Sequence, residues 1–359
     1  MAIDPAKLDA FMGKMVGEMG AAMNASLILL GDRLGLYRAM ADAGPLTSAQ
    51  LAAKTKMNER LLREWLNAQA AGGIVTYAPG ATPDAGTYTL PEEQALALAV
   101  EGSPAFLCGA YQILASVAKD LPKIENAFKT GKGLGWHEHD VCLFRGTERF
   151  FRPGYAAHLV NEWIPALMKG AVKAKLESGA AVADVGCGHG SSTILMAQAF
   201  PKSHFFGFDY HDASISAAQL AAEEAGVADR ITFQVAPAQG FPKEGGGFDL
   251  VAFFDCLHDM GDPAGAARHV KSTLAPSGVW MIVEPIAGDS VQENLNPVGR
   301  IMYCASTVIC TPASQAQAGA AALGAQAGER KLTQILNQAG FSHVRRAAQT
   351  PFNMVLEAR

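Results

Sequence analysis

VADVGCGHG, residues 182–190, is the stretch of this sequence that decides the fold. It begins as an apolar run and then breaks into three alternating glycines, Gly186, Gly188 and Gly190. The run that follows, SSTILMAQAF at 191–200, has its apolar residues at helical spacing. The stretch therefore predicts a buried strand, a glycine turn and an α-helix, in that order.

The glycine turn suits a nucleotide-like ligand. The three glycines tolerate positive φ and let a ligand approach the backbone, and the free N–H groups of the next helix attract polar or anionic groups. A second apolar run, HFFGFDYHD at 204–212, contains Asp209, which lies 19 residues after Gly190. An acidic residue about 20 residues beyond such a turn accepts hydrogen bonds from ribose hydroxyls. We expect Asp209, with Tyr210 beside it, to line the ligand site.

Two cofactors compete for this turn. In the dinucleotide fingerprint G-x-G-x-x-G the third glycine falls later than Gly190 does, and no acidic residue stands directly before the turn. The pattern here is Asp184-x-Gly-x-Gly-x-Gly. It resembles motif I of the class I S-adenosylmethionine (AdoMet) methyltransferases, whose loop receives the methionine and ribose of AdoMet. This resemblance favours AdoMet over NAD and implies that Asp209 holds the ribose hydroxyls. A glycine turn that serves only packing is the remaining alternative.

The composition argues against nucleic acid and membrane partners. The 29 Lys and Arg residues and 34 Asp and Glu residues give a net charge of −5 at pH 7, so no basic surplus points to an anionic partner. No apolar run reaches the roughly 20 residues of a membrane span, and the acidic start is unlike a secretion signal. The six cysteines are dispersed without a C-x-x-C pair. We expect reduced thiols in a cytoplasmic protein.

The first residues predict an interface helix. Residues 7–30 carry Leu, Phe and Met side chains at helical spacing, a stripe typical of a core or a subunit interface. A second helix is expected over 25–44, ending at Gly44. We expect the first helix to pack against a partner subunit in a homodimer.

The residues up to position 90 predict a winged helix-turn-helix. Thr47 or Ser48 caps a short helix, a longer helix ends at Gly72, and two short β-rich runs flank a Gly/Pro/Asp turn. Such a module often binds DNA, but the arginines of its second helix are offset by neighbouring glutamates. We favour a dimerisation and substrate-side domain, and keep DNA binding as the alternative.

Three domains are expected: 1–90 as the winged helix, 91–170 as a helical connector or lid, and 171–359 as the catalytic domain. The connector contains Trp136-His137-Glu138-His139. Two histidines at i and i+2 point to opposite sides of a strand and sit poorly together on a helix, which argues against a metal site. A polar contact with a substrate by one of the two histidines is the better functional reading, beside that of a solvated loop.

The catalytic domain alternates strands and helices, which predicts an α/β fold with a Rossmann-like parallel sheet and helices on both faces. Two final strands, in 342–348 and 352–358, resemble the antiparallel hairpin that closes class I sheets. Ligands bind such sheets at the carboxyl ends of the strands. The polar positions expected at those ends are Asp184, Asp209, the 236–239 loop, Asp255 and Glu284.

A base for methyl transfer is expected at His258. Methyl transfer is an in-line displacement, and a hydroxyl nucleophile must also lose a proton, for which histidine is well suited. His258 lies just after a strand end, flanked by Asp255 and Asp259, and Glu284 ends the next strand. A carboxylate that orients the imidazole is the usual companion of such a base. We expect His258, Glu284 and Asp255 to be catalytic.

The string CLHDMGDP at 256–263 resembles the LHDW-type signature of the winged-helix small-molecule O-methyltransferases. In that family the matching histidine is the general base, and a glutamate on the following strand positions it. Met260 replaces the tryptophan here. Family members also carry an acidic residue that holds the adenine amine, where this chain has Ala236-Pro237-Ala238-Gln239. We expect Ala238 and Gln239 to face the adenine in its place.

The resemblance implies AdoMet-dependent O-methylation of a small hydroxylated molecule, aromatic in one reading. The rivals are an AdoMet-binding transcriptional regulator and an enzyme that methylates nitrogen or carbon. The helix expected after residue 293 has two possible roles: it packs against the rest of the domain, or it forms a wall of the substrate site. The residues expected to face the acceptor are Trp136, His137, Tyr155, Phe254, Asn294, Arg300 and Tyr303.

Overall fold

The computed structural model describes residues 3–82 and 85–359. By its internal contacts the chain divides into two compact units, an N-terminal unit and a C-terminal unit, both of which take residues from the helical connector. The N-terminal unit comprises Met1–Ser116 and Val141–Pro153, and the C-terminal unit comprises Val117–Asp140 and Gly154–Arg359.

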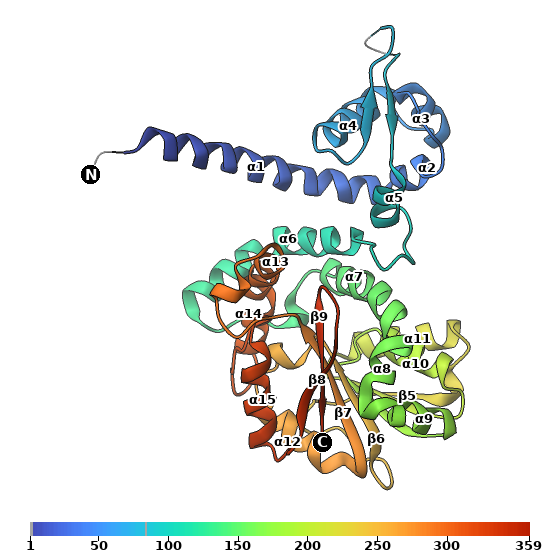
Figure 1. The fold of residues 1–359 in the computed structure, drawn as a ribbon, viewed down its shortest axis with the longest axis vertical. Helices are drawn as coiled ribbons and strands as arrows, with labels where there is room; N and C mark the ends of the chain where they lie inside the picture. The colour runs from blue at the N-terminus through green and yellow to red at the C-terminus, as the bar shows by residue number, and fades with distance from the viewer. Residues whose placement is uncertain (1–2, 83–84) are drawn as a thin grey trace. The chain divides into compact units, whose positions relative to one another are not determined.

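The N-terminal unit contains the helices and the small hairpin predicted for a winged helix (Figure 1). Thr47 accepts a hydrogen bond from the Gln50 backbone while the Gln50 side chain accepts from Thr47, so the predicted cap is confirmed. Asn58 caps the longer helix. The predicted hairpin turn falls partly on residues 83–84, outside the described residues. The elements are α1 (Pro5–Arg33), α2 (Leu36–Met40), α3 (Ser48–Thr55), α4 (Glu59–Ala71), β1 (Thr76–Ala78), β2 (Thr87–Thr89) and α5 (Glu92–Leu98).

The first helix is longer than the sequence pattern predicts. We expected one helix over 7–30 and a second over 25–44, but α1 runs unbroken from Pro5 to Arg33. The break falls at Gly35, whose φ of 69° lies in the left-handed region. Apolar residues keep helical spacing through both predicted segments, so periodicity alone could not locate this break.

The core of the N-terminal unit packs against the end of α1. A Cβ at Gly31 would lie 2.7 Å from atoms of both the Trp65 and the Tyr37 rings, so only glycine admits them there. Those two rings lie 5.3 Å apart between centroids. The buried Tyr37 hydroxyl donates to Gln69 Oε1 at 2.7 Å, which satisfies a polar group inside an apolar core.

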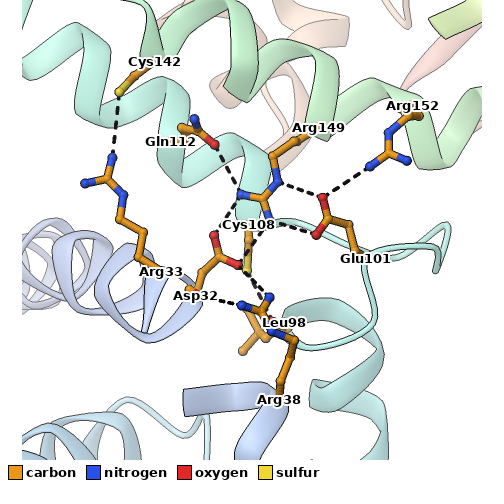
Figure 2. Close-up of polar contacts among 10 residues, drawn as sticks. All are labelled: Asp32, Arg33, Arg38, Leu98, Glu101, Cys108, Gln112, Cys142, Arg149 and Arg152. Carbon is orange, nitrogen blue, oxygen red and sulfur yellow. Dashed lines mark hydrogen bonds and ion pairs between the residues drawn. The ribbon is translucent and has the colours of Figure 1, made fainter. Parts of the chain in front are cut away.

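A cluster of charged side chains joins α1 to α7 (Cys142–His158) inside the N-terminal unit (Figure 2). Arg149 donates to both carboxylate oxygens of Asp32, at 2.9 and 3.2 Å, and to both of Glu101, at 2.9 and 3.3 Å. Asp32 is buried, and its other ion pair is a longer one to Arg38 at 3.6 Å. Because a buried carboxylate is costly without a partner, Arg149 holds these segments together.

The C-terminal unit is built on a seven-stranded sheet in the order β5-β4-β3-β6-β7-β9-β8. Neighbours from β5 to β7 pair in parallel, while β9 pairs antiparallel with both β7 and β8. The predicted Rossmann-like sheet with its closing hairpin is confirmed. The strands are β3 (Ala181–Val185), β4 (His204–Asp209), β5 (Ile231–Val235), β6 (Phe248–Phe254), β7 (Leu274–Pro285), β8 (Val344–Gln349) and β9 (Asn353–Ala358).

Helices cover both faces of this sheet, with α12 and α15 on one face and α9, α10 and α11 on the other (Figure 1). Strands covered on both faces are continuous apolar runs, as in residues 250–254 of β6, rather than alternating ones. Phe253 and Trp280 pack edge to face in this core at 4.9 Å between centroids. The remaining helices are α6 (Cys108–Thr130), α8 (Ile164–Ala166), α9 (Ala171–Ser178), α10 (Ser191–Ala199), α11 (Asp212–Glu224), α12 (Pro263–Thr273), α13 (Pro297–Ala305), α14 (Thr311–Gln315) and α15 (Gly328–Gln338).

The strand order creates a place for a ligand. From β3 the chain runs outward through β4 and β5, and then returns to β6 on the other side of β3. In sheets of this order the loops after two such strands diverge, and ligands bind in the crevice between them. The glycine turn and the His258 segment follow these two strands.

No helix within residues 3–82 and 85–359 is both long enough and apolar enough to cross a membrane. The three-part division at positions 90 and 170 stays a prediction, since α6 and α7 each contribute to both compact units.

Replacing Arg149 by methionine should destabilise the N-terminal unit by about 3 kcal/mol, because it leaves the buried carboxylate of Asp32 without its bidentate partner. The midpoint of urea unfolding, followed by circular dichroism, measures the change. Lys129→Met, which removes an exposed pair to Glu125, is the control and should cost less than about 0.5 kcal/mol. Equal effects of the two substitutions would contradict the role given to Arg149.

Candidate active site

The glycine turn adopts the backbone that its sequence requires. Gly186, Gly188 and Gly190 all have positive φ, between 52° and 79°. A Cβ at Gly190 would lie 2.7 Å from the Phe233 ring, and one at Gly186 would lie 2.8 Å from the Cys256 sulfur. Nothing lies within 4 Å of a Cβ built at Gly188. The middle of the turn thus leaves open space above the backbone, where a ligand can approach.

Asp184 connects the strand before the glycine turn to the helix after it. Its Oδ2 accepts hydrogen bonds from the hydroxyls of Ser192 and Thr193, both at 2.6 Å, which ties the end of β3 to the first turn of α10. Its Oδ1 is buried and has no hydrogen-bond partner among the described residues. Burial raises the pKa of Asp184 to about 6, against the two hydroxyl donors that lower it.

Asp209, the last residue of β4, hydrogen-bonds to the glycine turn. Its two carboxylate oxygens accept from the backbone N–H groups of Gly188 at 3.0 Å and His211 at 2.9 Å. Burial raises the pKa of Asp209, while these two donors lower it. Tyr210, next in sequence, keeps about half of its surface exposed. The Asp209 carboxylate therefore lies at the edge of the glycine turn, as the spacing predicted.

His258 and Glu284 form a buried pair at the carboxyl ends of β6 and β7. His258 Nδ1 lies 2.7 Å from Glu284 Oε2, and Glu284 Oε1 accepts from the Leu257 backbone N–H at 2.9 Å. Burial disfavours the charged imidazole, but the charge of Glu284, with a smaller contribution from Cys310, raises the pKa of His258 well above its usual value. Glu284 thus engages Nδ1 of the imidazole, and Cys310 is a second side chain that interacts with the ring.

Asp255 does not hydrogen-bond the imidazole, although it is close to His258 in sequence. Its oxygens accept from the Tyr155 hydroxyl at 2.7 Å and the Asn353 amide at 2.8 Å. Its φ of 50° is unusual for a residue other than glycine, and turns the chain directly after β6. Burial, and then the charge of Glu284, raise the pKa of Asp255 to about 7.

Asp259 receives the indole of Trp136. The Trp136 Nε1–H group donates to Asp259 Oδ2 at 2.6 Å across 123 residues of sequence. Burial raises the pKa of Asp259 to about 6, and the positive charge of His258 and the indole donor oppose that shift. His137, beside Trp136, lies edge-on to the Tyr210 ring at 6.5 Å between centroids. Trp136 and His137 thus reach the crevice from a distant turn.

Of the residues expected to face an acceptor, four gather near His258 or the glycine turn: Trp136, His137, Tyr155 and Phe254. The Tyr155 and Phe254 rings pack at 5.2 Å between centroids, beside Asp255. These side chains are mainly aromatic, which suits a flat, apolar ligand with a polar edge.

Asn294 is placed elsewhere. Its side chain bonds both the N–H and the carbonyl of Gly288, at 2.7 and 3.1 Å, so it closes a local loop. It also lines a separate cavity of about 760 Å³ between the start of α15 and the end of β8. Arg300 is exposed and Tyr303 half-buried on α13, and their roles toward an acceptor stay predictions.

Residues 236–239, where this chain lacks the family's acidic residue, make contacts within the protein. Gln239 donates from Nε2 to the carbonyl of Asp262 at 3.2 Å, and Ala238 packs partly buried against the sheet core. The expected contact of these two residues with an adenine ring remains a prediction.

Two further residues of the site were not found by sequence reasoning. Asn353 reaches Asp255 across 98 residues, from the start of β9. Cys310 interacts with the His258 ring and was expected only as a core cysteine. Neither carries a local motif, because each depends on how the chain folds back onto the sheet edge.

The histidines near position 137 do not share a site. His139 is buried against Asp120, whereas His137 faces Tyr210. In the part of the chain that the structure describes, no three His, Cys, Asp or Glu side chains are grouped so that they could hold a metal ion.

Two family models match the chain. Residues 176–340 match a methyltransferase domain, and residues 22–100 match the Rv2258c-like winged HTH domain. The first match covers the glycine turn and strands β3 to β7, and the second covers the end of α1 and the elements from α2 to α5.

Solved structures share the fold over nearly the whole chain. A putative O-methyltransferase of Nostoc punctiforme is 20% identical, with a TM-score of 0.70 over 100% of this chain and 99% of that one. Human N-acetylserotonin methyltransferase, solved in complex with SAM, is 15% identical with a TM-score of 0.69 over 100% and 98%. At these identities the likeness establishes a common fold.

Among curated relatives, the 27-O-demethylrifamycin SV methyltransferase of Amycolatopsis mediterranei is 28% identical over 131 residues. The match covers 35% of this chain and 48% of that protein. A ubiquinone biosynthesis O-methyltransferase of Psychrobacter arcticus is 31% identical over 106 residues, 29% of this chain and 40% of that protein. The chain therefore spans less than half the length of each of these two relatives.

Glu284→Gln should lower the pKa of His258, because it removes the negative charge that raises it. A histidine whose pKa is raised on folding adds stability that is full below the unfolded value and is lost as the pH rises through the folded value. The variant should therefore be less stable by about 2 kcal/mol at pH 6, with the difference shrinking at high pH.

The titration of His258 by NMR and urea unfolding at several pH values measure these two effects. Glu177→Gln, at an exposed pair with Lys173, is the control. An unchanged His258 midpoint in Glu284→Gln would show that Glu284 does not set its protonation.

Proposed function

We propose that this chain, whose residues 176–340 match a methyltransferase domain and whose residues 22–100 match the Rv2258c-like winged HTH domain, transfers the methyl group of AdoMet to a hydroxyl of a small molecule. The observation that carries the proposal is the buried His258–Glu284 pair at 2.7 Å. This pair lies beside the glycine turn, since the thiol of Cys256 contacts the carbonyl of Val185 at 3.4 Å.

The residues at the carboxyl edge of the sheet fit AdoMet. Gly188 leaves open space over its backbone, and Asp209 presents a carboxylate to ribose hydroxyls at the end of β4. The carboxyl groups of Asp184, Asp255 and Asp259 suit a ligand that carries positive charge. AdoMet supplies a methyl group bound to a positively charged sulfur, which makes that methyl electrophilic.

His258 is the proposed general base. Glu284 holds Nδ1 and so directs Nε2 toward the acceptor hydroxyl. The raised pKa means that His258 is protonated in the ligand-free protein near neutral pH. A positive charge bound nearby lowers the pKa of an imidazole, so cofactor binding favours the neutral form that can accept a proton.

The proposed acceptor is a small hydroxylated aromatic molecule. Its flat ring would contact the aromatic side chains of Trp136, Tyr155 and Phe254, which flank the carboxylates near His258. Aromatic walls with a few polar groups are typical of small-molecule sites.

A regulator that binds AdoMet and DNA is the second candidate. On α4, however, Arg60 lies 2.5 Å from Glu64 and Arg63 lies 3.3 Å from Glu59. These pairs neutralise the arginines that a DNA-reading helix would offer to phosphates. The ion pairs therefore support the enzyme rather than the regulator.

We also propose a cytoplasmic location. All six cysteines are free thiols, and four of them are buried. This supports the expectation of a reducing compartment.

A homodimer is proposed from the surface of α1. One 29-residue helix keeps a run of large apolar side chains in solvent, which is costly for a monomer. The interface would be formed with α1 of a second copy or with the surface that receives it. The exposed residues are Leu8, Phe11, Met12, Met15, Val16, Met19 and Met23.

Charges placed on this face should disrupt the dimer. Met15→Glu combined with Met19→Glu is expected to shift the mass measured by light scattering from dimer to monomer, because two carboxylates would be buried without partners. Leu61→Glu, at an exposed position of α4, should leave the mass unchanged. A wild-type protein that is already monomeric would contradict the proposed homodimer.

The cofactor assignment is tested by calorimetry with AdoMet and S-adenosylhomocysteine. Asp209→Ala should weaken AdoMet binding by about tenfold or more, because it removes a carboxylate worth roughly 1.5–3 kcal/mol in hydrogen bonds. Asp229→Ala, at an exposed acid of the same unit, should bind as the wild type does.

Binding by the wild type that is lost in Asp209→Ala would support the cofactor site and justify a screen of phenolic acceptors. A wild type that binds neither compound would contradict the methyltransferase proposal and return attention to DNA as a partner of the winged helix.

A further inference from the structure

The turn at 134–140, between α6 and α7, is the part of the C-terminal unit that carries Trp136 and His137. It is fixed where it begins, since the backbone N–H of Leu134 donates to the carbonyl of Pro312 at 2.9 Å. It is also closed on itself, because the Gly135 N–H donates to Glu138 Oε2 at 2.7 Å. Side chains presented from such a turn have little freedom to move.

The far end of the turn is held by a buried acid on α6. Asp120 Oδ2 accepts from His139 Nδ1 at 3.0 Å and from the backbone N–H of Asp140 at 2.8 Å. Lys123 pairs with Asp120 Oδ1 at 2.9 Å, and Lys119 pairs with Asp140 at 2.9 Å. The side chains of His139 and Asp120 are 0% and 2% exposed, so both are shielded from competing water.

Asp120 and His139 together form a clamp on the turn. His139 has one unfavourable feature. Its Nε2 is buried and has no hydrogen-bond partner among the described residues. Burial lowers the pKa of His139, against the raising effect of Asp120, so the ring is neutral with its proton on Nδ1. An apolar ring would avoid the orphan nitrogen. What histidine contributes here is therefore the directed Nδ1–H bond to Asp120.

The turn acts on the active site through Trp136. Its indole donates to Asp259 at 2.6 Å, and Asp259 is the immediate neighbour of His258. Hydrogen bonds to a carboxylate favour its ionised form, and an ionised neighbour favours a protonated imidazole. The Trp136 donor thus opposes the burial that raises the pKa of Asp259, and its loss would also change His258.

We propose that Asp120 and His139 are positioning residues of the methyl-transfer site: they lock the 134–140 turn so that Trp136 donates to Asp259 beside the base. Neither residue touches the reacting atoms, and both act through Trp136. The inference rests on the proposed function, since the site that they position is the one assigned there.

The test replaces the clamp and reads out Trp136 and His258 by NMR. In the wild type, the Trp136 indole N–H resonance, assigned by its loss in Trp136→Phe, should be shifted by its bond to a carboxylate. His139→Phe should move that resonance toward the position of an unbonded indole and lower the titration midpoint of His258. His139→Asn should restore both, because the Asn amide can occupy the place of Nδ1–H.

Matched variants separate positioning from general loss of structure. His204→Phe, at an exposed histidine of the same unit, should change neither signal. Trp136→Phe leaves the clamp intact and should lower the His258 midpoint as His139→Phe does, which keeps the inference testable if His139→Phe fails to fold.

An unchanged Trp136 resonance in folded His139→Phe would overturn the inference, as would an unchanged His258 midpoint in Trp136→Phe. These signals are read without any ligand. A failure of the wild type to bind AdoMet would therefore sink the proposed function while leaving the two contacts measurable.

Discussion

The constraint on which the carboxyl edge of the sheet depends is the full or partial burial of acidic groups that have no lysine or arginine partner. Asp184, Asp209, Asp255, Asp259 and Glu284 lie at the carboxyl ends of β3, β4, β6 and β7 or in the turns that follow them. Within the described residues, none of them forms an ion pair with a lysine or an arginine, and Glu284 pairs with His258. Buried carboxylates of this kind are tolerated only when neutral donors or protons satisfy them.

Those donors come from segments that are far apart in the sequence. Tyr155 on α7 and Asn353 on β9 hold Asp255, and Trp136 in the turn after α6 holds Asp259. The first turn of α10 supplies the hydroxyls for Asp184. Asp184, Asp255 and Asp259 therefore draw more distant elements onto the sheet edge. The same hydrogen bonds that make burial possible also build the walls of the crevice.

This arrangement explains which parts could be predicted from sequence. The glycine turn, Asp209 and the His258–Glu284 pair follow from local motifs and from the rule that parallel strands end at one edge. The spacing of VADVGCGHG to Asp209 fixes a turn and a strand within 30 residues, so no long-range information is needed. The closing hairpin could also be predicted from the sequence, because β8 and β9 are adjacent along the chain.

The partners of Asp255 and Asp259 could not be predicted in this way. Tyr155 and Asn353 lie 100 and 98 residues from Asp255, and Trp136 lies 123 residues from Asp259. Their pairing depends on where the connector and the last strand pack, which hydrophobic periodicity does not encode. The continuous helix α1 was missed for a related reason: only the left-handed φ of Gly35, and no change in periodicity, marks its end.

The protonation of these carboxyl groups connects stability to ligand binding. The pKa of Asp255 is raised from 3.8 to about 7, so the folded state binds a proton that the unfolded chain releases at lower pH. Stability from this group is therefore present below about pH 4 and lost as the pH rises toward about 7. Near neutral pH, burial and mutual repulsion disfavour the ionised forms of these carboxyl groups. A cation bound beside them would relieve that repulsion and favour the ionised forms, so this electrostatic cost contributes to the affinity for a positively charged ligand.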